Sequence, residues 1–235
     1  MILVLWDIDR TLLYVGGVDR LVYQKVFEEV VGRRAQVLPA RGTGVTMPLA
    51  VRQLLTDNGV ADAVVDEHTR RIVQLLPERL ADHADELRSE GVLMPGAVEA
   101  LSAVSETAGL VPTVVTGNLR GSAETKLRTF GLHNYVDMEV GGYSSDDQYR
   151  PALVGVAQAR ARGKYGHEFT RDNTVIIGDS LEDVRTGRQG GARIIAVASG
   201  TTTADQLSLA GADKVLTDLN DAEAILAAIH ALDAR

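Results

Sequence analysis

Two aspartates follow the first apolar run of the chain, "ILVLW", with a single Ile between them. They are Asp7 and Asp9. In a continuing strand, residues two apart point to the same face, so the two carboxylates would repel each other. Either the strand ends here and both acids are solvated, or a cation lies between them. An isolated Asp-x-Asp usually belongs to a turn, so other parts of the sequence are needed to distinguish these two possibilities.

Short apolar runs rich in β-branched residues recur along the chain, as in parallel strands that are buried on both faces. We expect strands at 2–6, 110–116, 174–178, 193–198 and 213–217. Between the last four, helical spacing occurs at 119–130, 151–165, 181–190 and 203–210, and another helix follows the last strand. Strands that alternate with helices predict a doubly wound, Rossmann-like α/β domain with a parallel sheet.

The interval from about 16 to 90 has no strand-like run and shows three helical patterns instead. Pro77 should kink or split the last of them. Gly16-Gly17 at one end, and Gly91 with "MPG" at the other, are candidate hinges. We therefore expect an α/β core formed by 1–15 and 91–235, with a helical cap domain, 16–90, inserted after the first strand.

Ligands of open parallel sheets bind at the carboxyl ends of the strands. There the sequence places Thr116, Gly117 and Asn118 after one strand, and Asp179 and Asp183 after another; Arg150 precedes a helix. Each has an ordinary alternative: Thr116 as a helix cap, Arg150 as a solvated cation, the acids as favourable charges in a first helical turn. Their convergence with Asp7 and Asp9 on one rim favours a single active site.

Phosphoryl transfer to a carboxylate is the chemistry that needs such a set. Four acids at close quarters cannot all stay ionised without a cation, and Mg²⁺ prefers carboxylate and phosphate oxygens. One Asp can attack phosphorus, and a second can protonate the leaving oxygen and later deprotonate water. Thr116, backbone N–H groups and Arg150 would hold the other phosphoryl oxygens. Asp7 and Asp9 are thus predicted as nucleophile and general acid/base.

The sequence resembles the haloacid dehalogenase superfamily, in the branch with a helical (C1-type) cap that includes phosphoglycolate phosphatase-like proteins. "DIDRT", Thr116 in "VVTGN", Arg150-Pro151 and "GDSLED" match the four family motifs in order. The resemblance implies a Mg²⁺ ion held by a side-chain oxygen of Asp7, the main-chain oxygen of Asp9, and Asp179, with Asp183 assisting.

Two residues depart from the family pattern. Arg10 stands where Gly is most frequent; we expect its side chain to point to solvent, although it could reach the cap and the substrate. Arg150 replaces a common Lys, which keeps the charge and adds a fork suited to phosphate. Asp9 argues against dehalogenation, because family dehalogenases lack this acid. Lys25 is the sole lysine of the expected cap, which disfavours Schiff-base hydrolysis of phosphonates.

The polar stretch "PARGTGVT", 39–46, is the part of the cap that we expect to contact the substrate. Arg41, Thr43 and Thr46 could bind a second anionic or hydroxylated group there, and the two glycines allow close backbone approach. The alternative is an ordinary connection between two helices, since loops serve both purposes.

Composition excludes several other classes of protein. A net charge of -8 and an isoelectric point near 5.1 argue against a nucleic-acid or anionic-membrane surface. The absence of cysteine excludes disulfides, thiolate zinc sites and Cys nucleophiles. No apolar stretch approaches the ~20 residues that span a bilayer, and no signal peptide is evident. We expect a cytoplasmic monomer or homodimer.

Together these features predict an enzyme: a Mg²⁺-dependent phosphatase that hydrolyses a small phosphorylated metabolite through an aspartyl-phosphate. A sugar phosphomutase of the same fold would use the same acids and remains an alternative. So does a non-catalytic phosphate-binding regulatory module, although such a module has no need for an acid placed to protonate a leaving group.

Overall fold

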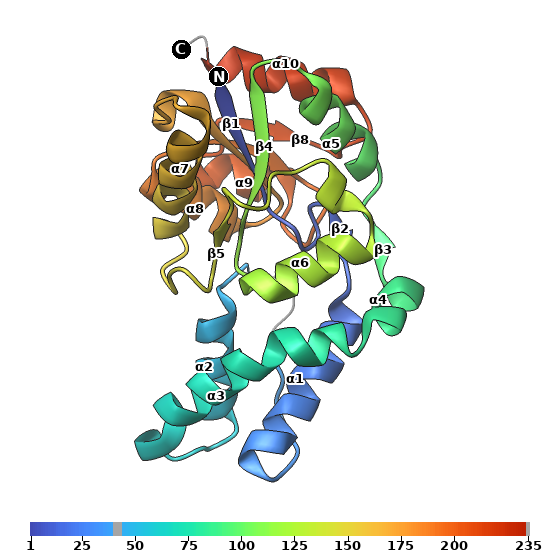
Figure 1. The fold of residues 1–235 in the computed structure, drawn as a ribbon, viewed down its shortest axis with the longest axis vertical. Coiled ribbons are helices and arrows are strands. Elements are labelled where there is room, and N and C mark those ends of the chain that lie inside the picture. The colour runs from blue at the N-terminus through green and yellow to red at the C-terminus, as the bar shows by residue number, and fades with distance from the viewer. Residues whose placement is uncertain (40–43, 234–235) are drawn as a thin grey trace.

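The protein is built around one parallel sheet, as the computed structural model shows for residues 1–39 and 44–233 (Figure 1). Six strands lie in the order β5-β4-β1-β6-β7-β8, and every neighbouring pair is parallel. Their bounds are β1 (Ile2–Trp6), β4 (Leu110–Thr116), β5 (Gly142–Tyr143), β6 (Thr174–Gly178), β7 (Arg193–Val197) and β8 (Lys214–Leu216). The predicted α/β class with a doubly wound sheet is confirmed.

Helices cover both faces of this sheet. Alternate residues of β1 point to opposite sides: Val4 and Trp6 join a hydrophobic cluster with residues of α5 and α10, whereas Leu3 and Leu5 pack with residues of α7. The helices of this domain are α5 (Ala97–Glu106), α6 (Arg120–Thr129), α7 (Ala152–Tyr165), α8 (Leu181–Gly190), α9 (Ala204–Ala210) and α10 (Ala222–Asp233), with short 3₁₀ turns at Leu132–Asn134 and Arg171–Asn173.

Four helices form a second layer beyond one end of the sheet (Figure 1). They are α1 (Gly16–Val31), α2 (Met47–Asp57), α3 (Asp62–Ala81) and α4 (Ala84–Glu90). A two-stranded antiparallel ribbon, β2 (Leu13–Tyr14) with β3 (Val92–Leu93), pairs the chain entering this layer with the chain leaving it. The helical layer therefore emerges from the end of the sheet where β1, β4 and β6 finish.

Pro77 does not split its helix, contrary to one of the predicted outcomes. The helix α3 continues past it to Ala81, and the break before α4 comes at Asp82 and His83. Pro77 instead packs against Gly121 of α6, where an added Cβ would lie 2.9 Å from the Cβ of Pro77. The ring that removes a helical hydrogen bond is thus used as a contact between the two layers.

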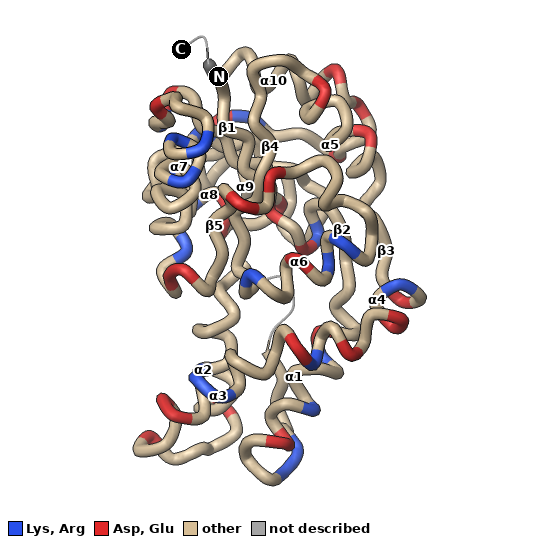
Figure 2. The backbone as a smooth tube through the Cα atoms, in the orientation of Figure 1, with Lys and Arg blue, Asp and Glu red and all other residues tan. Residues whose placement is uncertain are grey.

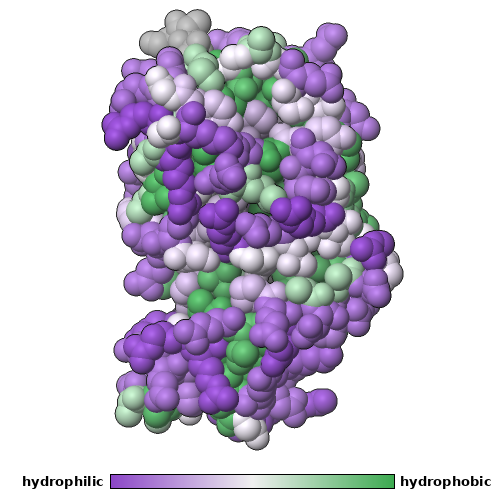
Figure 3. Space-filling model, in the orientation of Figure 1, coloured by the Kyte–Doolittle hydropathy of each residue, from purple (hydrophilic) through white to green (hydrophobic). Residues whose placement is uncertain are grey.

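The strands β2, β3 and β5 were not predicted, because two residues are too few to show a period. Lysines and arginines are interspersed with aspartates and glutamates along the backbone drawn in Figure 2. Hydrophilic residues cover most of the face drawn in Figure 3. Among the helices that the structure describes, none has the length and hydrophobicity needed to cross a membrane.

Candidate active site

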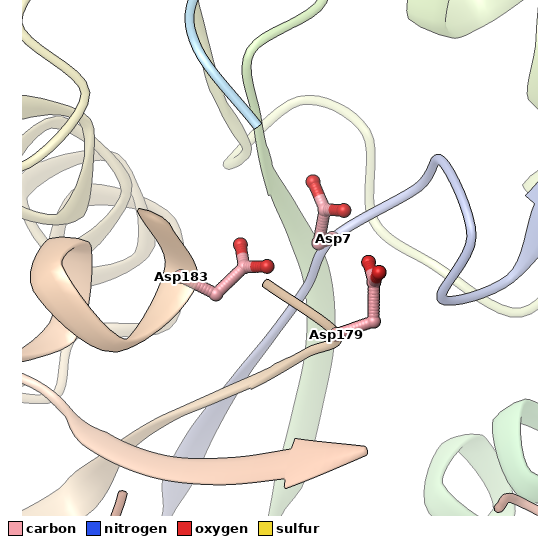
Figure 4. Close-up of side chains that lie close together, drawn as sticks. All are labelled: Asp7, Asp179 and Asp183. Carbon is pink, nitrogen blue, oxygen red and sulfur yellow. The ribbon is translucent and has the colours of Figure 1, made fainter. Parts of the chain in front are cut away.

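Three carboxylates converge where the central strands end (Figure 4). Asp7 follows β1, Asp179 follows β6, and Asp183 lies in the first turn of α8. Each offers an oxygen within 4.8 Å of the others, and all three residues are buried. The neighbouring strands β1 and β6 are in register at Trp6 and Ile177, so the acids that follow them must meet.

Crowding makes these acids hard to ionise. Burial raises the pKa of Asp7 well above its ordinary value, and the charge of Asp183 raises it further, while Arg150 opposes both. Burial, followed by Asp183, raises the pKa of Asp179 to about 7. Desolvation and like charges both disfavour the ionised forms, so the three acids together can be ionised only with more positive charge than Arg150 supplies.

Arg150 supplies the one protein cation in direct contact with this cluster among the described residues. Its side chain is 1% exposed, and one terminal nitrogen donates to Oδ1 of Asp7 at 2.7 Å and to Oδ1 of Asp183 at 2.5 Å. The other terminal nitrogen donates to the carbonyl oxygen of Gly44. Arg150 is therefore a buried hydrogen-bond donor to two of the acids and not a solvated cation.

The remaining oxygens determine what the cluster could hold. Oδ2 of Asp183 accepts hydrogen bonds from the backbone N–H and the hydroxyl of Ser180, at 3.0 and 2.6 Å. Oδ1 of Asp179 accepts from Thr11 at 3.2 Å. Within the described part of the chain, nothing donates to Oδ2 of Asp7 or Oδ2 of Asp179. Carboxylate oxygens of Asp7 and Asp179 that line the cavity and accept no hydrogen bond from the described residues fit a hard divalent cation such as Mg²⁺, with Asp183 in a supporting place.

Gly200 leaves room beside one of these oxygens. A Cβ at this position would lie 1.7 Å from Oδ2 of Asp179. A side chain there would displace the carboxylate, so the approach of the 198–201 loop to the cluster depends on glycine.

A second polar cluster surrounds Asp9. Lys126 donates to its Oδ1 at 2.8 Å, and the side-chain amide of Asn118 donates to its Oδ2 at 2.7 Å. The same amide donates to the hydroxyl of Thr116 at 2.8 Å. Lys126 also donates to Asp19 of α1 at 2.9 Å. Asp9 is thereby held at both oxygens, with 37% of its side chain still exposed.

Lys126 and Asp19 were missed by the sequence analysis. A signal existed for Lys126: the buried positions of α6 are Ser122, Ala123, Lys126 and Leu127, so a lysine occupies the face that packs inward. A fully buried lysine is rare unless it is paired. Asp19 gave no comparable signal, because an acid in the first turn of a helix is favoured anyway.

Arg10 corrects the expectation that its side chain points to solvent. It lines the same cavity as Asp7 and Asp9, and its guanidinium lies 4.4 Å from the ring centroid of Tyr14. Its φ is 68°, the single positive φ among non-glycine residues in the described ranges. This left-handed conformation costs free energy for any residue with a Cβ, which explains why glycine suits the position.

The predicted site residues surround one cavity of about 150 Å³ between sheet and helices. Those that line it include Asp7, Asp9, Thr116, Gly117, Asn118, Arg150 and Asp179. Asp183 is not in the lining and lies behind Asp7, linked to it through Arg150. From the helical layer, α1, the segment before α2 and the first residue of α2 contribute Asp19, Tyr23, Pro39, Gly44, Val45 and Met47.

The stretch 39–46 is described only in part. Arg41 and Thr43 lie outside the described residues. Thr46 corrects an expectation: it is buried and donates its hydroxyl to the carbonyl of Gln148 at 2.8 Å, outside the cavity lining. The end of the stretch crosses Gly117 closely, since a Cβ on Gly117 would lie 2.5 Å from the carbonyl oxygen of Val45.

Comparison with known proteins identifies the family. The profile of the haloacid dehalogenase-like hydrolases matches residues 4–188. A protein named "Probable phosphatase IndB", from Dickeya dadantii, is 28% identical over 145 residues, which are 62% of this chain and 59% of that protein's length.

Solved structures share the fold. A hydrolase from Pseudomonas syringae aligns with a TM-score of 0.70 and 21% identity, over 97% of this chain and 99% of that one. CbbY from Rhodobacter sphaeroides, solved in complex with phosphate, aligns with a TM-score of 0.63 and 19% identity, over 94% and 96%. The family resemblance seen in the sequence is confirmed: the chain belongs to the haloacid dehalogenase-like hydrolases.

Proposed function

We propose that this protein is a Mg²⁺-dependent phosphatase that hydrolyses a small phosphorylated metabolite through an aspartyl-phosphate on Asp7. One observation carries the proposal: Asp7 and Asp9 line the same cavity but belong to different hydrogen-bonded clusters. Different surroundings give two carboxylates different roles, one as nucleophile and the other as proton donor and acceptor.

The metal would be held by Asp7 and Asp179 through their free oxygens and by the main-chain oxygen of Asp9, with Asp183 in support. When bound, it supplies positive charge that keeps the acids ionised and offsets the charge of the phosphoryl group. The raised pKa values of Asp7 and Asp179 support this assignment, because both acids gain from a nearby cation.

The protein's own groups account for the two half-reactions. A carboxylate oxygen of Asp7 attacks phosphorus, and the bond from phosphorus to the leaving oxygen breaks. The electron pair of that bond stays on the leaving oxygen, which takes a proton from Asp9. Asp9 then accepts a proton from the water that attacks phosphorus, and the bond to Asp7 breaks. Thr116, the backbone beside Gly117 and the guanidinium of Arg150 would hold the other oxygens.

The cavity supports a small substrate. Its volume of about 150 Å³ is below the ~300–1,000 Å³ usual for drug-sized ligands.

We assign residues 16–90 as a cap domain over the core of 1–15 and 91–235. Arg41 and Thr43 of this cap are candidate contacts to the rest of the substrate. A cytoplasmic monomer or homodimer belongs to the same proposal. The relative named a phosphatase and the phosphate complex of CbbY support phosphate chemistry.

The test is phosphate release from a panel of phosphate monoesters: phosphoglycolate, sugar phosphates, nucleoside monophosphates and p-nitrophenyl phosphate. We expect release with Mg²⁺, none with excess chelator, and none from Asp7→Asn. Release that survives in chelator, or in the variant, would contradict the proposed mechanism. If only an added sugar bisphosphate starts turnover of a sugar phosphate, the protein is a phosphomutase; if folded protein binds phosphate without turnover, it is a regulatory module.

A further inference from the structure

Lys126 joins the two layers of the molecule at the active site. Its ammonium has three N–H groups, and each has a partner: Asp9 at 2.8 Å, Asp19 at 2.9 Å and the side-chain oxygen of Asn118 at 3.0 Å. Lys126 lies on α6 beside the sheet, whereas Asp19 lies in the first turn of α1. One buried cation thus connects the carboxylate of Asp9 to the helical layer.

We propose that Lys126 is a positioning residue for Asp9, and that Asp19 holds Lys126 in the place where it can do so. Asp9 would then be set for proton transfer only while the first turn of α1, which carries Asp19, lies within hydrogen-bond distance of Lys126. This inference rests on the proposed function, because it assigns the geometry of the acid/base that the phosphatase would use.

The three charged side chains of this cluster differ in how much of each is exposed. The side chains are 0% exposed for Lys126, 20% for Asp19 and 37% for Asp9. Asp9 is the most exposed of the three and lines the cavity together with Asp19, while Asn118 and Lys126 hold its two oxygens. A carboxylate held at both oxygens has lost its rotational freedom, which is what a proton donor at a fixed distance requires.

If the contact between α6 and α1 were purely structural, side chains with a smaller desolvation cost could provide it. Burial alone would lower the pKa of Lys126, but Asp19 and Asp9 outweigh it and hold the pKa above the ordinary value. Burial raises the pKa of Asp19, against the pull of Lys126. Apolar residues at both 126 and 19 would avoid the cost of desolvating two charges. The buried ammonium has a clear use only if the place of Asp9 matters.

Substrates with different leaving groups can distinguish a positioning role of Lys126 from a purely structural one. An alkyl phosphate needs a proton on its leaving oxygen, whereas p-nitrophenolate leaves without one. Because kcat/KM reports the steps up to departure of the leaving group, a displaced Asp9 should slow alkyl substrates selectively. Loss of a purely structural contact should slow both substrates alike.

The experiment measures kcat/KM for the best alkyl phosphate of the panel and for p-nitrophenyl phosphate. For Lys126→Met we expect a loss of about 100-fold on the alkyl substrate and about threefold or less on the aryl one. Asp19→Asn should show the same selectivity with a smaller loss, about tenfold. Lys164→Met, which removes ion pairs to Asp137 and Glu139 outside the site, should change neither.

Equal losses on both substrates, or an unchanged alkyl rate, would overturn the inference. If Lys126→Met does not fold, Lys126→Met/Asp19→Asn removes one charge of each sign and takes its place. Crystal structures of the variants give a second readout, expected to show the Asp9 carboxylate displaced. An undisplaced carboxylate overturns the positioning role even if the wild type hydrolyses nothing, which would itself refute only the phosphatase.

Discussion

Two buried cations, each between two aspartates, divide the active site into an Arg150 cluster and a Lys126 cluster. Arg150 binds Asp7 and Asp183, and Lys126 binds Asp9 and Asp19. In the Arg150 cluster, all the charged groups come from the sheet domain. In the Lys126 cluster, one acid comes from α1.

The clusters also differ in how far their hydrogen bonds are satisfied. Every N–H of the Lys126 ammonium has a partner. In the Arg150 cluster, Nε of Arg150 is buried without a partner among the described residues, and Asp179 adds a third acid nearby. Three acids thus share one cation in the Arg150 cluster, which suits this cluster to bind a further cation, whereas the Lys126 cluster has its hydrogen bonds complete and is suited to hold one carboxylate still.

The largest effect should separate the two acids. Asp7→Asn removes the nucleophile, and we expect at least about a 10⁴-fold loss of kcat/KM on every substrate. Asp9→Asn should lose about 10²–10⁴-fold on alkyl phosphates and far less on p-nitrophenyl phosphate. Steady-state assays on both substrates test this. Matching losses for the two variants on the aryl substrate would erase the distinction between the clusters.

Metal rescue should distinguish the clusters next. Arg150→Met and Lys126→Met each leave buried acids without their cation, and we expect each to lower the free energy of unfolding by about 3–5 kcal/mol. Saturating Mg²⁺ should restore much of the loss in Arg150→Met, because its acids are the expected metal ligands, and little in Lys126→Met. Urea unfolding with and without Mg²⁺ measures both. Equal rescue would place the metal elsewhere.

Asp179, in the Arg150 cluster, should contribute to the pH dependence of stability. The pKa of Asp179 is raised from 3.8 to about 7, so the folded protein holds this proton more tightly than the unfolded chain. Without metal, its contribution to stability is full below about pH 4 and is lost as the pH rises to about 7. The stabilisation by Mg²⁺ should grow over the same range. Asp179→Asn should abolish this part of the slope in urea unfolding, and an unchanged slope would refute the assignment.

The smallest effect concerns the turn that joins Asp7 and Asp9 to β2. Arg10→Gly and Arg10→Ala both remove the contact with Tyr14, but only glycine relieves the φ of 68°. We therefore expect the glycine variant to be more stable than the alanine variant by about 1 kcal/mol. The midpoints of urea unfolding, compared at equal m-values, measure the difference in stability between the two variants. Equal stability would mean that this turn rearranges when Arg10 is lost.

Much of the sheet domain follows from the sequence alone. Continuous apolar runs are the pattern of strands buried on both faces, and all five expected strands form. Parallel strands place their carboxyl ends at one edge of the sheet, so Asp7, Thr116 and Asp179 could be expected on one rim once the sheet was predicted. That their strands are direct neighbours is known from the structure. These are local signals, each readable within about ten residues of the chain.

The partners of the charged side chains follow from the packing of the chain and not from any local pattern. Lys126 and Asp19 are 107 positions apart, and no local pattern records that the first turn of α1 meets Lys126 of α6. The direction of Arg10 depends on Tyr14 and on a left-handed turn, which a sequence does not display for a residue other than glycine. Strand and helix types are set by periodicity within a segment, whereas ion pairs are set by which segments meet, and that depends on the packing of the whole chain.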